Sequence, residues 1–277
     1  MHWIVERAAR DEDTDPMLWM ATGRHSRTDD MARLIAVLEG RGIPHTVVRK
    51  KPFADYLISM TDETPMTVKP DARVFAYGST TMELVSKASG WAPGFLDAPE
   101  MLEAISHWGR HMLNHDVQVA EIGTMQVPEG SFFIRPDADG KAFAGMVIND
   151  DEFETWRAQV LDVKGWTSLP PSTRVLYGPV RRIDAEWRLA IVERRVAAAS
   201  MYRQSGRMRQ VEGASAEVIA YAEARAAEWN PRTAYVMDIC DTPKGLRIVE
   251  TNSISSAGFY AMDMAAYVAA IEEARFP

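Results

Sequence analysis

The chain has 277 residues, 47% hydrophobic and 25% charged, which is the composition of a globular protein long enough for one large domain or two modest ones. The net charge of −8 argues against nucleic acid as the main partner, because proteins that bind phosphate backbones usually carry a basic surplus. A single cysteine, Cys240, excludes an internal disulfide, no apolar run approaches the roughly 20 residues that cross a bilayer, and the N-terminus does not read as a signal peptide, so we expect a cytoplasmic protein with no membrane partner.

The first third of the chain alternates strand-like and helix-like segments. Strands are expected at residues 2–5, 45–48 and 73–77, and helices at 28–38 and 80–88. This alternation predicts a small α/β sheet. Gly90, Pro93 and Gly94 then break the chain, so we place a domain boundary near this point and assign residues 1–95 to an N-terminal α/β domain.

The remainder, residues 96–277, is expected to be α+β with largely antiparallel strands. A helix is expected to start at Asp97, with Glu100 three residues later as a capping pair. The segments that follow are strands at 132–135, 142–148, 173–177, 186–192 and 196–202, a helix near 215–229, a hairpin of 234–240 with 246–251, and a terminal helix at 262–274.

The most informative local feature is the hairpin that carries Asp238, Glu250 and Asn252. Positions 250 and 252 point to one face of a strand, and the turn residues at 242–245 place position 238 opposite position 250. Three oxygen-bearing side chains would then converge, and Mg²⁺ prefers such ligands. The alternative is a pair of solvent-facing acids on an ordinary hairpin. The small, polar segment 252–258 favours a ligand site over that alternative.

Two cations flank an earlier turn. Arg135 ends an apolar strand, and Lys141 begins the return strand after the turn at 137–140. An Arg fork and a Lys point charge at such a turn are suited to clamping phosphates. The Asp-x-Asp-Gly turn lacks the further ligands of a calcium loop, and the chain has neither the Walker nor the Rossmann glycine pattern.

The strand at 186–192 alternates in character. Trp187, Leu189 and Ile191 form one apolar face, whereas Glu186 and Arg188 lie on the other. Such charges are either solvated, paired with each other or part of a site.

Three histidines, His107, His111 and His115, are spaced by four residues and could share a helical face. The outer two would lie about 12 Å apart along a helix, so all three cannot bind one ion. We expect a surface or partly buried row of histidines rather than a zinc site. Cys240 lies in an apolar strand and is expected to be an inert core residue.

Taken in order, these segments resemble the ATP-grasp superfamily. Its strand that ends in a basic residue and proline is matched by Phe133-Ile134-Arg135-Pro136, its Glu-x-Arg strand by Glu186-Trp187-Arg188, and its Asp and Glu-x-Asn metal ligands by Asp238 and Glu250-Thr251-Asn252. Arg135-Pro136, the segment 141–145, the Glu-Trp-Arg and Gly258-Phe259-Tyr260 resemble in particular the divergent clade with an arginine and lysine signature. The chain departs from the common pattern in having Arg135 where most members have Lys, and Arg110 is only a guess for the preceding Lys.

This resemblance implies an α+β ATP-grasp fold, in which two lobes clasp ATP after a small α/β pre-ATP-grasp domain. The cationic hairpin lobe would span about 115–178 and the metal-binding lobe about 179–277. Its implied nucleotide-binding residues are Arg135, Lys141, Tyr177 and Val180 of the adenine linker, and Glu186. Mg²⁺ would be bound by Asp238, Glu250 and Asn252, with Arg188 and Lys141 in catalytic roles.

The activity that the resemblance implies is that of an ATP-dependent carboxylate–amine ligase, which forms an amide through an acyl phosphate. Its partners would be a small-molecule or peptide carboxylate and an amine, as in peptide or protein modification. Two alternatives share the fold: a non-catalytic ATP-binding sensor or scaffold, and an ATP-dependent kinase or phosphotransferase. The sequence leaves the two substrates and the oligomeric state open.

Overall fold

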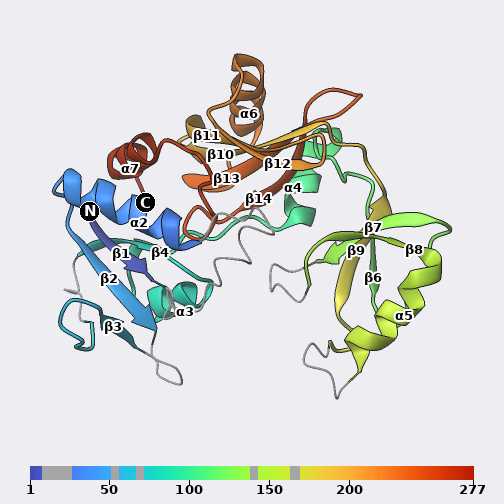
Figure 1. Cartoon of the computed structure of the whole chain (residues 1–277), viewed down its shortest axis with the longest axis horizontal. Helices are drawn as coiled ribbons and strands as arrows, with labels where there is room; N and C mark the ends of the chain where they lie inside the picture. Colours follow the sequence, from blue (N-terminus) through green and yellow to red (C-terminus); the bar gives the residue numbers. More distant parts are fainter. Residues whose placement is uncertain (8–26, 51–55, 67–71, 138–142, 163–168) are drawn as a thin grey trace.

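The computed structural model describes residues 1–7, 27–50, 56–66, 72–137, 143–162 and 169–277, and it arranges them around three β-sheets (Figure 1). The fold is an α+β ATP-grasp-like arrangement in which a lobe built on one sheet stands apart from the other two. No helix among the described residues is both long and apolar enough to cross a bilayer.

The N-terminal sheet has the strand order β3-β2-β1-β4-β5. Strand β1 pairs in parallel with β2 and β4, as the α/β expectation requires. Because helices and the neighbouring sheet cover both faces of β1, its residues Trp3, Ile4 and Val5 are all fully buried. The elements of this part are β1 (His2–Glu6), α2 (Arg27–Gly40), β2 (His45–Lys50), β3 (Leu57–Ser59), β4 (Arg73–Tyr77), α3 (Thr81–Ala88) and β5 (Ala92–Gly94).

The C-terminal sheet is antiparallel, with the order β12-β11-β10-β13-β14. Trp187, Leu189 and Ile191 of β10 pack on one side with α6 and α4, which confirms the predicted apolar face. The opposite side shares a core with the N-terminal sheet and α7, so these two sheets are fused. The elements are α4 (Met101–Trp108), β10 (Ala185–Val192), β11 (Arg195–Gln204), β12 (Arg207–Glu212), α6 (Ala216–Glu228), β13 (Ala234–Asp241), β14 (Arg247–Asn252) and α7 (Met264–Glu273).

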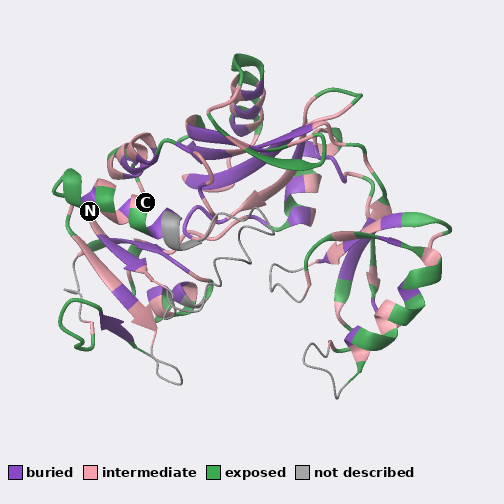
Figure 2. Ribbon diagram, in the orientation of Figure 1, coloured by how far each residue is buried: buried purple, intermediate pink, exposed green. Residues whose placement is uncertain are grey.

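The middle lobe has its own core and the strand order β6-β9-β7-β8. Phe132 and Ile134 of β7 are buried beneath α5, and Phe153 of α5 packs against Phe132 with ring centroids 5.4 Å apart. Figure 2 shows the buried residues along the strands and the outer side of α5 exposed. The elements are β6 (Gln118–Glu121), β7 (Ser131–Pro136), β8 (Met146–Asn149), α5 (Asp150–Leu161) and β9 (Arg174–Pro179).

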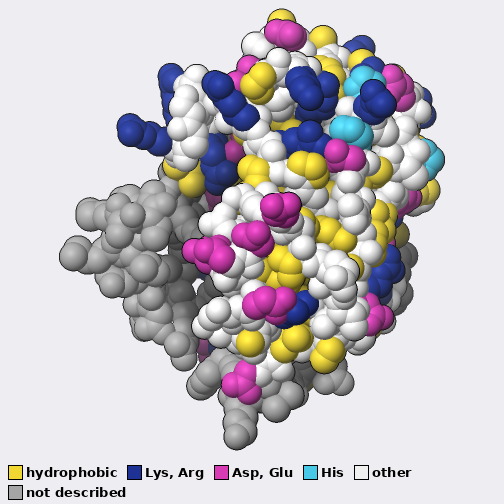
Figure 3. Space-filling view, turned by 90° about the vertical axis from the view of Figure 1, so that its right-hand side faces the viewer, with side chains coloured by type: hydrophobic (Ala, Val, Ile, Leu, Met, Phe, Trp, Pro, Cys, Tyr) yellow, Lys and Arg dark blue, Asp and Glu magenta, His cyan; other side chains and the backbone are white. Residues whose placement is uncertain are grey.

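Charges are unevenly distributed over the surface. In Figure 3, which looks onto the side of the middle lobe, Lys, Arg and His side chains gather toward the top, at the height of α6 in Figure 1, whereas Asp and Glu side chains lie lower. Exposed arginines on β11 and β12, such as Arg203, Arg207 and Arg209, place positive charge on the C-terminal lobe despite the negative net charge.

Two predicted boundaries are wrong. The helix expected from Asp97 begins at Met101, because Asp97 instead pairs with Arg232 at 2.8 Å and Glu100 is the N-cap residue without a side-chain cap bond. The return strand expected from residue 142 begins at Met146. Helix α5 and the edge strands β6 and β12 were not expected from the sequence, because their polar faces hide the apolar periodicity.

Candidate functional site

The predicted acidic hairpin forms from β13 and β14, and its register places Asp238 opposite Glu250 as expected. Its turn closes through a hydrogen bond from Gly245 N to Thr242 O at 2.9 Å, with Gly245 at φ 86°. The register shifts between Asp238 and Ile239, where Ile239 pairs with Ile248 and leaves Val249 as an extra residue. This bulge lets Ile248 face the core while Glu250 turns to the other side.

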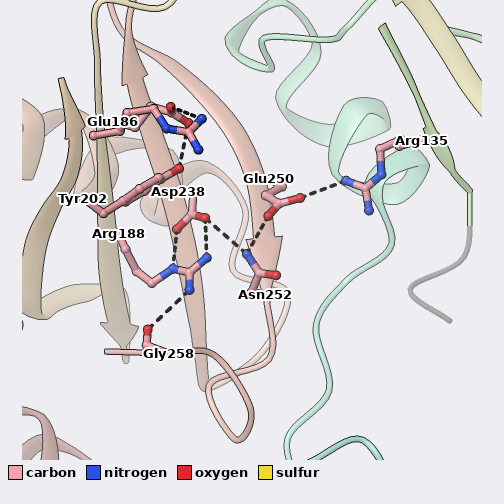
Figure 4. Close-up of polar contacts among 9 residues, drawn as sticks. Arg135, Glu186, Arg188, Tyr202, Asp238, Glu250, Asn252 and Gly258 are labelled. Carbon is pink, nitrogen blue, oxygen red and sulfur yellow. Dashed lines mark hydrogen bonds and ion pairs between the residues drawn. The ribbon is translucent and has the colours of Figure 1, made fainter. Parts of the chain in front are cut away.

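Asn252 joins the two acids. Its Nδ2 donates to Glu250 Oε1 at 3.1 Å and to Asp238 Oδ2 at 3.4 Å (Figure 4). The Asp238 side chain is only 2% exposed and that of Glu250 33%, so Asp238 is not a solvated hairpin residue. The three predicted metal-ligand side chains therefore do converge.

Arg188 stands opposite Asp238 on the neighbouring strand β10. Its Nε and Nη2 donate to the two carboxylate oxygens at 2.9 and 2.7 Å, and its Nη1 donates to the carbonyl of Gly258 at 3.3 Å. Burial works against the charge of Arg188, but the Asp238 carboxylate outweighs it and raises the pKa of the guanidinium. Burial raises the pKa of Asp238 as well, against the opposing effect of Arg188. Because both carboxylate oxygens receive guanidinium N–H groups, we take the pair as ionised at neutral pH.

Two tyrosines support Arg188. The rings of Tyr202 and Tyr260 are stacked with centroids 4.9 Å apart, and the Arg188 guanidinium carbon lies 5.9 and 5.1 Å from them. The Tyr202 hydroxyl donates to Glu186 Oε2 at 2.8 Å, and Arg203 donates to Glu186 Oε1 at 3.0 Å. Burial, followed by the charges of Asp238 and Glu186, raises the pKa of Tyr202, so this hydroxyl keeps its proton and acts as a donor. Glu186 is 4% exposed and paired rather than solvated.

Arg135 reaches this network from the middle lobe. Its Nη1 donates to Glu250 Oε2 at 3.0 Å, and its Nε donates to the carbonyl of Pro136 at 3.2 Å. The contact with Glu250 is an ion pair between two lobes, visible at the right of Figure 4. Lys141, the other predicted cation of this hairpin, lies outside the described residues.

A cavity of about 530 Å³ separates the two lobes at this network. Arg135, Val180, Glu186, Glu250 and Asn252 of the predicted set line it. Tyr177 instead packs in the middle-lobe core and donates to Gln118 at 2.8 Å. Arg188 and Asp238 lie behind the cavity wall. The apolar part of the lining consists mainly of Leu113, Phe133, Pro136, Phe143, Met146, Pro179 and Ile183.

A second cavity, of about 430 Å³, meets the first at Arg135 and Glu250 and extends toward the N-terminal domain. Its wall is rich in acids, since Glu83, Asp97, Glu100 and Glu103 line it together with Arg232. The two spaces thus adjoin at the place where the two lobes exchange an ion pair.

The residues fit a magnesium ion in chemistry, because two carboxylates and an amide supply hard oxygen atoms. Asn252 uses its nitrogen to bond both acids, and its Oδ1 has no hydrogen-bond partner in the described part of the chain. Within that part, no three His, Cys, Asp or Glu residues cluster as for a metal site. The three histidines do not converge either: His107 stacks on Trp229 at 4.2 Å, and His111 contacts Arg225 at 2.9 Å.

Sequence reasoning did not single out Tyr202 or Asn114, which also line the first cavity. The alternation of residues along β11 places Tyr202 on one face of its strand, but nothing in the sequence shows that this face meets Glu186. Asn114 lies in a turn without a recognisable motif.

Comparison with known families and structures agrees with this geometry. The model of an ATP-grasp domain family, family 3 of the clade with the arginine and lysine signature, matches residues 60–271. The fold is similar to that of a D-cycloserine synthetase, with a TM-score of 0.60 and 12% identity over 99% of each chain. It is also similar to D-alanyl-alanine synthetase A from Vibrio cholerae, with a TM-score of 0.58 and 11% identity over 96% of this chain and 91% of the other. A third similar structure is a RimK domain ATP-grasp protein from Sphaerobacter thermophilus, with a TM-score of 0.53 and 14% identity over 91% of each chain. No curated protein matches the sequence significantly.

Proposed function

The chain belongs to family 3 of the arginine and lysine signature clade of ATP-grasp domains, and on that basis we propose that it is an ATP-dependent ligase that joins a carboxylate to an amine. The observation that carries this proposal is the network Arg188–Asp238–Asn252–Glu250, which stands at the cavity between the lobes and faces Arg135. Such an arrangement of fixed charges suits the positioning of phosphates.

ATP would bind in the 530 Å³ cavity with its phosphates toward Arg135, Glu250 and Asn252. Lys141 would add a second cation from the same hairpin. Asp238, Glu250 and Asn252 would hold Mg²⁺, which when bound neutralises phosphate charge. Because Arg135 occupies Glu250 Oε2, nucleotide binding would require this ion pair to open, and its guanidinium would then be free to bind a phosphate oxygen.

The reaction would occur in two displacements. A substrate carboxylate oxygen attacks the γ-phosphorus, the bond to the bridging oxygen breaks, and ADP leaves an acyl phosphate. An amine then attacks the acyl carbon, phosphate departs, and the amine loses a proton as the amide forms. No side-chain nucleophile is needed for either step.

The second cavity is the suitable place for these substrates, because it meets the nucleotide cavity at Arg135 and Glu250. It is large enough for a small molecule or the end of a peptide. The role proposed for Arg188, stabilising the transferring phosphoryl group, requires the guanidinium to leave Asp238. Both of its bonds to Asp238 use donors that a phosphate would need.

A direct test combines Mg-ATP with a panel of carboxylates and hydroxylamine as the amine, and measures phosphate together with hydroxamate. The proposal expects both products in equal amounts, released only when carboxylate and amine are present. Binding of ATP without hydrolysis would instead identify a sensor or scaffold, and phosphate found on a stable product would identify a kinase. Either result contradicts the ligase.

Glu250→Ala should abolish the magnesium-dependent turnover of ATP while the fold stays intact. Glu223→Ala is a matched control, because Glu223 pairs with the exposed Arg195 on the outer side of the C-terminal lobe. Unchanged turnover in Glu250→Ala would refute the metal-site assignment.

A further inference from the structure

The cavity between the lobes has two chemically different ends. Arg135, Glu250 and Asn252 mark the phosphate end. Two residues earlier on β14, about 7 Å along the strand, the backbone of Ile248 accepts a hydrogen bond from Leu113 N at 2.7 Å. The segment 112–114 therefore lies beside the other end of the cavity, where Leu113, Val180 and Ile183 provide apolar walls that suit a base.

Asn114 is the polar residue that this segment contributes to the cavity. It is only 7% exposed, yet its side-chain amide makes no hydrogen bond to any described residue. It is also not among the side-chain atoms that are both sealed from solvent and unpartnered. The amide thus reaches open space, and the open space that Asn114 lines is the nucleotide cavity.

The backbone around Asn114 is held on both sides. Met112 forms a parallel bridge with Ile248, and Val117 N donates to Asn114 O at 3.4 Å. Asp116 forms an ion pair with Arg181, which follows the predicted adenine linker and also lines the cavity. The side chain of Asn114 is therefore carried by a fixed turn but left without a partner of its own among the described residues. A buried amide in this state costs free energy unless a ligand completes its hydrogen bonds.

A carboxamide presents one acceptor and one donor side by side. Adenine offers the matching pair, because its N6 amino group is a donor and lies next to a ring nitrogen that is an acceptor. We propose that Asn114 reads the base of the nucleotide, with Oδ1 accepting from the N6 amino group of adenine and Nδ2 donating to the adjacent ring nitrogen. Asn114 is then a specificity-determining residue. This inference rests on the proposed binding of ATP between the lobes.

The test measures the dissociation constants of ATP and of purine riboside triphosphate, which lacks the N6 amino group, by calorimetry on the full chain. The unmodified protein should bind ATP about tenfold more tightly than the analogue. Asn114→Leu, which keeps the size of the side chain, should bind ATP about tenfold to hundredfold more weakly and should no longer distinguish the two nucleotides.

Asn114→Asp provides a second variant of the same shape, which keeps the acceptor but loses the donor and should also weaken ATP binding. Asn149→Asp makes the same chemical change at an exposed position away from the cavity and should bind ATP as the unmodified protein does.

The inference is overturned if Asn114→Leu weakens both nucleotides by the same factor, which would assign Asn114 to the ribose, or if it weakens neither. If the unmodified protein binds no ATP, the proposed function fails together with it. If it binds ATP with unchanged discrimination in Asn114→Leu, only the assignment of Asn114 fails.

Discussion

Two arginine–carboxylate pairs meet at the site, and they differ in almost every physical respect. Arg188 and Asp238 belong to adjacent strands of one sheet, make two hydrogen bonds, and have side chains that are 12% and 2% exposed. Arg135 and Glu250 belong to different lobes, make one hydrogen bond of 3.0 Å, and are 16% and 33% exposed. The C-terminal lobe thus holds its charges in place without a ligand, whereas the middle lobe contributes its cation through a contact that a ligand can replace.

The largest effect is expected where the inner pair is broken. Asp238→Asn leaves the Arg188 guanidinium buried beside a neutral amide, and this should lower the free energy of unfolding by about 3–5 kcal/mol. Urea unfolding measures the change. Asp241→Asn is the control on the same strand, because the Asp241 side chain forms no ion pair among the described residues, and its effect should stay within about 0.5 kcal/mol. A loss below about 1 kcal/mol in Asp238→Asn would show that the inner pair does not organise the lobe.

Breaking the outer pair should affect binding rather than stability. Arg135→Met should change the free energy of unfolding by less than about 1 kcal/mol, because the pair is partly exposed. Its affinity for ATP should fall about tenfold to hundredfold, since a charge-assisted hydrogen bond to phosphate is lost. Arg174→Met, which removes an exposed arginine that pairs with Asp137 in the same lobe, is the control and should leave ATP affinity unchanged. Equal losses in the two variants would indicate a general effect of charge.

A smaller effect is expected behind the inner pair. Tyr202→Phe removes the hydroxyl that donates to the buried Glu186 and should lower the free energy of unfolding by about 1 kcal/mol, because Arg203 still pairs with the carboxylate. Tyr235→Phe is a matched control on β13, because the Tyr235 hydroxyl is buried and has no partner among the described residues. Its removal should be neutral or stabilising, and a larger loss in Tyr235→Phe than in Tyr202→Phe would contradict this view of the network.

The smallest effect concerns Cys240, which lies on β13 two residues from Asp238. Burial raises the pKa of this thiol to about 12 and shields it fully, which agrees with the inert core residue expected from the sequence. A thiol reagent at pH 8 should therefore not label the native protein within hours, yet should label it at once in urea. Rapid labelling of the native protein would mean that the inner hairpin opens often.

The acidic hairpin could be predicted because its information is local. Turn residues at 242–245 fix its register, and the alternation along β14 places Glu250 and Asn252 together. The apolar face of β10 could also be predicted, from the periodicity of Trp187, Leu189 and Ile191. In each case the pattern lies within one strand or two strands joined by a short turn.

The contacts that give the site its character are long-range, and no local pattern encodes them. Arg188 lies 50 residues from Asp238, and Arg135 lies 115 residues from Glu250. The helix start expected at Asp97 was wrong for the same reason, since a capping residue was claimed by the distant Arg232. Asn114 could not be recognised because its significance is the absence of a partner among the described residues, which only the folded chain reveals.

The most direct test of the central claim is a crystal structure with a non-hydrolysable ATP analogue and Mg²⁺. We expect the nucleotide in the cavity between the lobes, with its phosphates beside Arg135, Glu250 and Asn252 and the Arg135–Glu250 ion pair open. A nucleotide bound anywhere else, or bound there with its phosphates turned away from the acidic hairpin, would contradict the account.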